Sequence, residues 1–247
     1  MEKKDINKAR QELVVKSNVL IRDTRYELSE LEQKFIIYLI AKVAREDTNL
    51  QEVKVRLKDY CEIAGIEYNN GNIKHLKHTI KSIADKSWWI PSANGGVDIF
   101  RWIWRANVKG QQATIQLDSS LLPYLVELKR DFTKYELINV LLLRGKYSIR
   151  LYEIFKSYLW NREWNVSIEE LRALINCDKY PRYAEFNRNI LKKSIEEINK
   201  HTDINVEYEP IRYGRFIEEI EFYITEKQGI EQGLAMLENQ QKRLKGR

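Results

Sequence analysis

The chain contains one apolar pattern twice, and this repetition constrains its fold more than any other feature. The segment LKHTIKSIADKS begins at Leu76, and LKKSIEEINKHT begins at Leu191. In each segment the apolar residues share one face of a helix. Aligning the segments superposes Leu76, Ile80 and Ile83 on Leu191, Ile195 and Ile198. The pattern predicts a diverged tandem repeat of one unit about 115 residues long.

Each copy has the same order of predicted elements. An extended piece and a short helix (VKVRLKDYCEIAGI, then WNVSIEELRALINC) precede a longer helix, expected from Asn72 to Lys86 in the first copy. Strand and turn patterns follow in both copies. This is the order of a winged helix, a helix-turn-helix with a β-hairpin attached. We therefore predict an α+β protein of two tandem winged-helix domains, residues 1–125 and 126–228, followed by a basic tail at 229–247.

Local signals place several element boundaries. Ser29, Thr133 and Ser167 each stand three residues before a Glu, the pattern of a capping box, so each is expected to begin a helix. The first of these helices is predicted to run from about residue 30 to 44. In the strand VDIFRWIWRANV, Phe100, Trp102 and Trp104 alternate, which predicts that they share one pleat face.

Composition narrows the class of protein. Hydrophobic residues make up 43% of the chain and charged residues 32%, which is typical of a folded protein. The net charge of +6 favours a polyanionic partner. Cys61 and Cys177 form no CxxC pair, so we expect neither a disulfide framework nor a cysteine zinc site, and a reducing cytoplasm fits best. No apolar run approaches the roughly 20 residues that span a bilayer, and the first 20 residues lack the apolar core of a signal peptide.

Cations and amides lie on the polar faces of the repeated helices. In a winged helix the second helix of the helix-turn-helix enters the major groove, where such side chains reach phosphates and base edges. A solvated charged face is the alternative interpretation. The predicted DNA contacts are Lys74, Lys77, His78, Lys81 and Ser82 on the first helix, Arg182, Asn187, Arg188, Asn189, Lys192 and Lys193 on the second, and Arg212 and Arg215 in the second hairpin.

Other motifs indicate no catalysis. His75 and His78 are three residues apart, but no carboxylate or cysteine pattern completes a metal site nearby. Trp102 and Trp104 resemble a stacking platform for single strands, although such a pair in a wing strand is more often core. The GKYS at 145 lacks the Gly-rich loop that binds phosphate. We expect no enzyme activity, metal or cofactor.

Segments in both halves of the chain carry a resemblance to a known family. KYSIRLYEIFKSY, VSIEELRALI and KYPRYAEFNRNILKKSIEEINKHTDINVEYEPI, followed by IEEIEFYI, resemble the second domain of the iteron-binding plasmid replication initiators. The first half is similar to their first domain through LSELEQKFIIYLIAKV, RLKDYCEIAG and FRWI. The resemblance covers about residues 10 to 225. Many relatives carry consecutive basic residues after the equivalent of Phe186, whereas this chain has Asn187, Arg188 and Asn189. Because Asn prefers adenine and Arg guanine, different bases are expected to be read.

The resemblance implies a function. Such initiators bind directly repeated sites in a plasmid origin, promote opening of adjacent AT-rich DNA and recruit the host replication initiator and helicase. They bind repeats as monomers and dimerise, through the first domain, to repress their own gene. Two alternatives remain: a dimeric winged-helix repressor, which would bind a palindrome, and a rolling-circle initiator, which would nick DNA through a tyrosine. The second needs a His-x-His pair, and none of the three histidines forms one.

Overall fold

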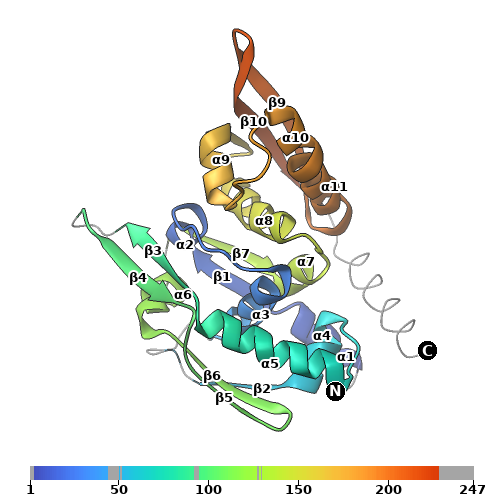
Figure 1. The fold of residues 1–247 in the computed structure, drawn as a ribbon. Helices are drawn as coiled ribbons and strands as arrows, with labels where there is room; N and C mark the ends of the chain where they lie inside the picture. Colours follow the sequence, from blue (N-terminus) through green and yellow to red (C-terminus); the bar gives the residue numbers. More distant parts are fainter. Residues whose placement is uncertain are drawn as a thin grey trace.

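The computed structural model describes residues 3–43, 50, 52–91, 95–126, 128 and 130–227. The predicted tail at 229–247 lies outside the described residues. Helices and strands form two units, one above the other in Figure 1, with the long helix α8 (Lys146–Tyr158) between them.

The first unit is built around helix α3 (Glu30–Ala41). Its helices and strands are, in chain order, α1 (Lys3–Arg10), β1 (Leu13–Ser17), α2 (Asn18–Arg22), α3, β2 (Val53–Arg56), α4 (Leu57–Ala64), α5 (Asn70–Ala84), β3 (Ser87–Pro91), β4 (Val97–Arg101), β5 (Ile103–Lys109), β6 (Gln112–Leu117), the 3-10 turn η1 (Ser119–Leu121), α6 (Leu122–Leu125), β7 (Phe132–Glu136) and α7 (Leu137–Leu141).

The second unit follows α8 and is smaller. It consists of β8 (Glu163–Ser167), α9 (Ile168–Leu174), a long helix in three parts, α10 (Tyr183–Phe186), η2 (Asn187–Leu191) and α11 (Lys192–His201), and the hairpin β9 (Ile204–Tyr213) and β10 (Phe216–Glu226).

The two units repeat one arrangement. The order β2, α4, α5, β5, β6 in the first unit corresponds to β8, α9, α10–α11, β9, β10 in the second. In each, the short first strand pairs antiparallel with the second strand of the hairpin, giving the sheets β2–β6–β5 and β8–β10–β9. These are the helix-turn-helix and wing of a winged helix. The prediction of two tandem winged-helix domains in an α+β fold is confirmed.

The predicted helix faces are also confirmed. Leu76, Ile80 and Ile83 of α5 are buried, and so are the corresponding Leu191, Ile195 and Ile198. Ser29 caps α3 reciprocally with Glu32, and Ser167 accepts a hydrogen bond from the Glu170 backbone N–H at the start of α9. Periodicity and capping are local properties, which is why the sequence predicts them well.

Two local predictions are wrong. Thr133 begins no helix, because residues 132–136 form strand β7, and its hydroxyl donates to Asn18 Oδ1 instead. Trp104 does not share a face with Phe100 and Trp102, which are buried while Trp104 is 70% exposed. The chain leaves the β3–β4 hairpin at Trp102 and joins another sheet, with a register shift between Ile103 and Arg105. This change of sheet breaks the two-residue alternation.

Strand β7 pairs with β1, which lies far earlier in the chain, with Leu13 opposite Glu136. The pair lies beside α8, which contacts α2, α3 and β7 of the first unit and α11 of the second. Residues beyond 125 therefore pack on the first unit, while the boundary placed at that residue stays a prediction. The buried residues of both units form one hydrophobic cluster.

A buried polar cluster ties β1 to α8. Lys16 of β1 donates to Glu153 of α8 at 2.6 Å, and the two side chains are only 2% and 0% exposed. Tyr135 donates to the same carboxylate oxygen. Arg150, one turn earlier on α8, donates to the backbone carbonyl of Thr24 at 2.7 Å. These contacts hold α8 against the first unit.

Both cysteines lie in the described part of the chain. Cys61 and Cys177 are both buried and free. Among the helices of the described ranges, none is long and apolar enough to cross a membrane.

Candidate nucleic-acid interface

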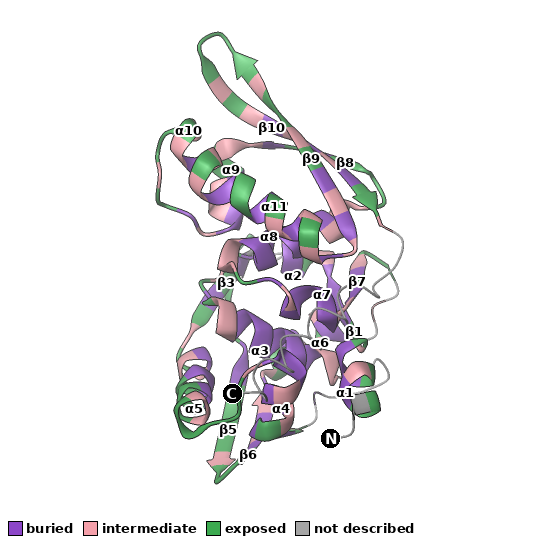
Figure 2. Ribbon diagram, turned by 90° about the vertical axis from the view of Figure 1, so that its right-hand side faces the viewer, coloured by how far each residue is buried: buried purple, intermediate pink, exposed green. Residues whose placement is uncertain are grey.

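The two long helices of the repeated units are exposed on the same side of the molecule. Figure 2 shows α5 and the first part of the second helix, α10, along its left edge, with exposed residues on both. The buried residues of each helix pack on its own unit, and the other residues of the helix face outward. One chain therefore presents two helices to one side.

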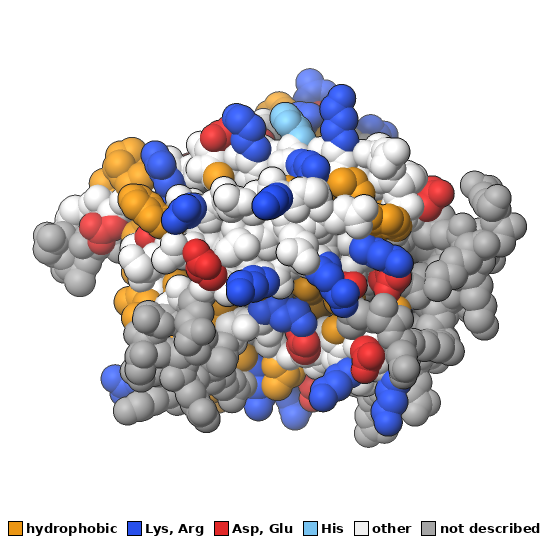
Figure 3. All heavy atoms as spheres, turned by 90° about the horizontal axis from the view of Figure 1, so that it is seen from below, with side chains coloured by type: hydrophobic (Ala, Val, Ile, Leu, Met, Phe, Trp, Pro, Cys, Tyr) orange, Lys and Arg blue, Asp and Glu red, His pale blue; other side chains and the backbone are white. Residues whose placement is uncertain are grey.

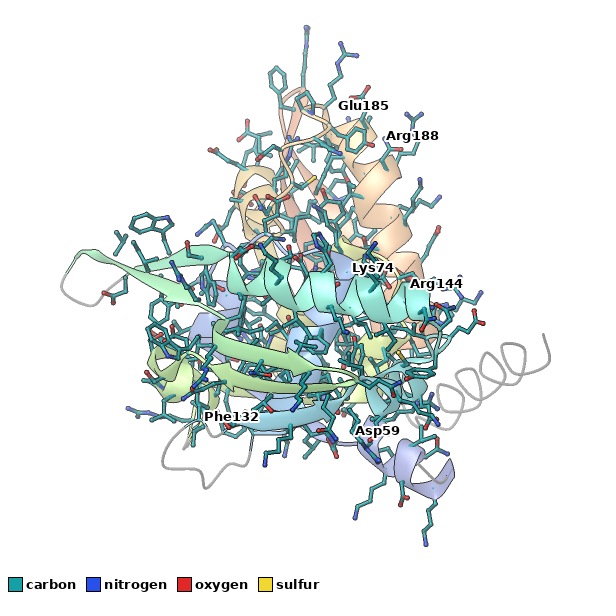
Figure 4. The ribbon with its side chains drawn as sticks, turned by 60° about the horizontal axis from the view of Figure 1, so that its bottom comes forward. Asp59, Lys74, Phe132, Arg144, Glu185 and Arg188 are labelled. Carbon is teal, nitrogen blue, oxygen red and sulfur yellow. The ribbon has the colours of Figure 1, made fainter. Side chains whose placement is uncertain are left out.

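Helix α5 carries exposed cations. Lys74, Lys77 and His78 are exposed, and within the described ranges no ion pair involves them. Lys81 pairs with Asp85 at 2.7 Å, but both side chains are more than half exposed, so this pair contributes little stability and leaves the cation accessible. Figure 4 shows Lys74 on the outward side of the helix. This face suits contact with phosphates.

Ser82 differs from the other predicted contacts on α5. It is half-buried, and its hydroxyl donates to Glu32 Oε1 at 2.6 Å. Lys86 donates to the other oxygen of that carboxylate at 2.7 Å. Burial raises the pKa of Glu32, but hydrogen bonds from Lys86, Ser82 and Ser29 together bring it below its ordinary value. Ser82 thus serves the packing of α5 on α3, and its contact with DNA stays a prediction.

The second helix presents its cations in the middle. Arg188, Lys192 and Lys193 are exposed, and Figure 4 shows Arg188 pointing away from the protein. Lys192 approaches Glu196 at 4.0 Å, one turn on, with both side chains about two thirds exposed. Such a surface pair is weak and leaves Lys192 free to meet a phosphate.

The amides beside Arg188 are less accessible. Asn187 and Asn189 are half-buried, and Asn187 Oδ1 accepts a hydrogen bond from the Tyr208 hydroxyl at 2.6 Å. The helix is π-type from Asn187 to Leu191, and the backbone N–H of Lys192 bonds to the carbonyl five residues back. Such wide turns are rare and frequent at functional sites. No sequence signal predicted this one.

Arg172 orders the approach to the second helix, and the sequence analysis missed it. Its guanidinium donates to the carbonyls of Lys179, Tyr180 and Pro181, at 2.7, 2.6 and 3.2 Å, and lies over the Phe186 ring. The exposed Arg182 follows directly and precedes the first turn of α10. Arg172 therefore holds the loop that positions Arg182.

The wings carry the remaining predicted cations. Arg212 lies on the same face of β9 as Val206 and Tyr208, the face turned to the second helix. Arg215 follows Gly214, whose φ of 62° is left-handed and suits glycine in this tight turn. Both arginines are exposed. Helix and wing thus both expose cations to solvent.

Groups for metal chemistry are not brought together. No cluster of three or more His, Cys, Asp or Glu residues in the described part of the chain has the arrangement of a metal site. The surface supports binding through charge and hydrogen bonds.

Two family models match this chain. The family model described as "Initiator Replication protein, WH1" matches residues 13–156, and "Initiator Rep protein, WH2" matches residues 167–224. A replication initiation protein of Escherichia coli is 23% identical over 79% of this chain and 65% of its own length. The chain thus spans just under two thirds of that relative. An uncharacterised 27.6 kDa protein of E. coli is 25% identical over 77% of this chain and 82% of its own.

Solved structures share the fold. The Pi initiator protein, in a crystal structure with iteron DNA, matches with a TM-score of 0.73 at 18% identity, over 89% of this chain and 99% of that one. Domains 2 and 3 of RctB match with a TM-score of 0.51 at 12% identity, over 81% and 82% of the two chains. The two family models together cover most of the chain in the order of its winged helices, and the protein belongs to the initiator replication protein family.

Proposed function

We propose that this protein is a sequence-specific, double-stranded DNA-binding initiator of plasmid replication. It binds directly repeated origin sites through both winged helices and promotes opening of the adjacent DNA. Binding alone performs this task, so the protein acts without catalytic chemistry or a cofactor. By the same reasoning, host initiator and helicase proteins are its partners in the cytoplasm, and a dimeric form represses its own gene.

One observation carries this proposal. Two helices with exposed cations, α5 and α10–α11, lie on the same side of a single chain. Two unlike reading units in one chain bind a non-palindromic site as a monomer, and such sites can be repeated in one direction. A repressor with one winged helix per chain would need a dimer and a palindrome.

Footprinting across the DNA that flanks the gene tests the function. We expect evenly spaced protections on direct repeats, with band shifts that add one monomer per repeat. A single palindromic footprint would make the protein a repressor. Cleavage of the supercoiled DNA with magnesium or manganese would instead indicate a nicking enzyme.

The variant Arg188→Ala tests base reading by the second helix. Arg188 is exposed at the π-type turn that faces outward. If its guanidinium reads a base, its loss is expected to weaken binding to the footprinted repeat by about 1 to 3 kcal/mol and relax preference at one position. Band shifts with each single-base variant of the repeat measure both effects.

Lys192→Ala is the matched control. Lys192 is exposed on the same helix, and a contact to phosphate carries no sequence information. This variant is expected to weaken binding to all sequences alike and reduce the salt slope by about one. If both variants bind like the original protein, the second helix does not read DNA.

Self-association is proposed to use the β3–β4 hairpin. Trp88, Ile90 and Phe100 point into the core, while Trp89 and Ile99, opposite each other on the two strands, are 57% and 60% exposed. Together with the exposed Val97 they form a contiguous apolar face. Contiguous exposed apolar patches mark interaction sites, and a two-stranded sheet leaves edges for pairing.

Trp89→Lys is expected to shift the protein toward monomer in sedimentation velocity at micromolar concentration, because it places a charge in the apolar face. Trp160→Lys is the control, since Trp160 is 85% exposed but lies elsewhere. Equal sedimentation of the original protein and both variants would exclude this face. Binding to one repeat should be unchanged in the Trp89 variant.

A further inference from the structure

The two wing sheets expose one face each to solvent. In both, alternate residues pack inward on the helices of their own unit, so the remaining residues form the outer face. The first sheet lies at the lower end of the molecule and the second at the upper end in Figure 1. Neither sheet face is covered by another described element of its unit (Figure 1).

The outer face of the first sheet, here called the basic face, is cationic and otherwise polar. It consists of Lys54 and Arg56 on β2, Gln112, Thr114 and Gln116 on β6, and Arg105, Asn107 and Lys109 on β5. Arg56 pairs with Asp59 at 2.7 Å, whereas Lys54, Arg105 and Lys109 have no ion-pair partner within the described ranges. Glu52 stands at its rim.

Figure 3 views this end of the molecule. Lys and Arg side chains are spread over this face, with fewer Asp and Glu side chains among them. This end faces along the stack of the two units, whereas α5 and α10 face sideways (Figure 2). The basic face therefore lies at one end of the molecule and not on the side where α5 and α10 lie (Figure 1 and Figure 2).

The outer face of the second sheet, here called the acidic face, has the opposite charge. It consists of Glu163 and Asn165 on β8, Glu219, Glu221 and Tyr223 on β10, and Glu207 and Glu209 on β9. Its five carboxylates have no ion-pair partner among the described residues. The corresponding sheets of the two repeated units thus carry opposite charge on their outer faces.

Like charges meet directly on the acidic face. Glu221 stands opposite Glu209 across β10 and β9, and such pairs are destabilising. Glu221 accepts a hydrogen bond from the Tyr223 hydroxyl at 2.8 Å, and this bond, with the neighbouring carboxylates, raises the pKa of Tyr223 to about 12. A cationic partner would relieve this repulsion.

We propose that the basic face of one molecule docks on the acidic face of a second molecule of this protein. The contact joins two different surfaces, so it forms head-to-tail rows and not closed pairs. Molecules bound on direct repeats all point the same way, which makes a head-to-tail contact available at every step. Complementary charge sets orientation and register. The part of this inference that concerns molecules bound on DNA rests on the proposed function.

Charge reversal on each face tests the proposal. The acid-reversed variant carries Glu163→Lys, Glu207→Lys and Glu209→Lys, and the base-reversed variant carries Lys54→Glu, Arg105→Glu and Lys109→Glu; all six positions are exposed. Band shifts compare DNA with one repeat and DNA with two at the native spacing. The original protein is expected to bind the second repeat about 5- to 50-fold more tightly, which lies within the usual range of coupling between sites.

Each reversed variant is expected to lose this preference while binding one repeat normally. The sixfold variant, with both faces reversed, restores opposite charges across the contact and should regain the preference. A control with Glu67→Lys, Glu169→Lys and Glu170→Lys changes the net charge as much as the acid-reversed variant does, at exposed positions off both faces, and should keep the preference. A sixfold variant without the preference would overturn the proposal. So would weaker binding of the base-reversed variant to one repeat, which would assign the basic face to DNA.

Mixing the two reversed variants tests the contact without DNA. In each variant alone, the two sheet faces carry net charge of the same sign and repel each other. In a mixture, each face of one variant meets a face of opposite charge on the other variant. Light scattering is expected to show larger particles in the mixture than in either variant alone. These larger particles are expected to disappear between about 50 and 500 mM salt, because salt screens the attraction between the faces. No growth in the mixture would refute the contact. Absence of any specific footprint would instead count only against the proposed function, because mixing needs no DNA.

Discussion

Replacing Glu153 by alanine is expected to lower the free energy of unfolding by about 3 to 5 kcal/mol, because it leaves a buried cation without a partner. Lys16 is 2% exposed, and its ammonium lies 2.6 Å from the Glu153 carboxylate. The change also removes the acceptor of the Tyr135 hydroxyl. Urea unfolding followed by tryptophan fluorescence measures the loss.

The control removes both charges together. A double variant, Lys16→Met with Glu153→Leu, keeps side-chain volume and leaves no buried ion. Because replacing a whole buried pair is often neutral, it should be much more stable than Glu153→Ala, with a residual loss for the unpaired Tyr135 hydroxyl. Equal losses in the single and double variants would show that the pair does not explain the effect. Since α8 contacts α11, we also expect weaker DNA binding by Glu153→Ala.

The second large effect is expected at Leu191. This side chain is fully buried and lies where the π-type turn meets α11. Truncation to alanine removes its packing and leaves a cavity, so we expect a loss of about 2 to 5 kcal/mol in the free energy of unfolding. Thermal melting and urea titration measure it.

Lys200→Ala is the matched control for Leu191→Ala. Lys200 is exposed on the same helix, and such surface changes usually stay within about 0.5 kcal/mol. Wild-type melting of Leu191→Ala would contradict the assignment of the inward stripe. A loss of DNA binding without a loss of stability would show that Leu191 acts on the helix surface and not in the core.

The sequence predicted the helix faces well but the burial of α3 poorly. Helical periodicity predicts the burial of one face, yet every residue from Glu32 to Ile40 is buried. Helix α3 contacts β1, α5, α7 and α8, so other elements cover it on several sides. A one-dimensional pattern reports a preference for burial, whereas the number of neighbours depends on elements distant in the chain.

Some predicted site residues are exposed, whereas others form hydrogen bonds within the protein. Arg188 and Lys192 are exposed as the helical period predicts. Ser82 and Asn187 have the residue types of DNA contacts, but Glu32 and Tyr208 already bind their side chains. Arg172 gave no signal, because its acceptors are backbone carbonyls that any sequence provides.

By itself, the sequence determined the repeat, the winged-helix order and the outward cations, because these follow from helical and strand periods within a few turns of chain. Only the tertiary structure decided the pairing of β1 with β7, the change of sheet at Trp102 and the opposite charges of the two wing faces. Each depends on which distant strands become neighbours and in what register. A local pattern predicts which face of a strand is buried, but it does not specify which distant strand becomes its partner.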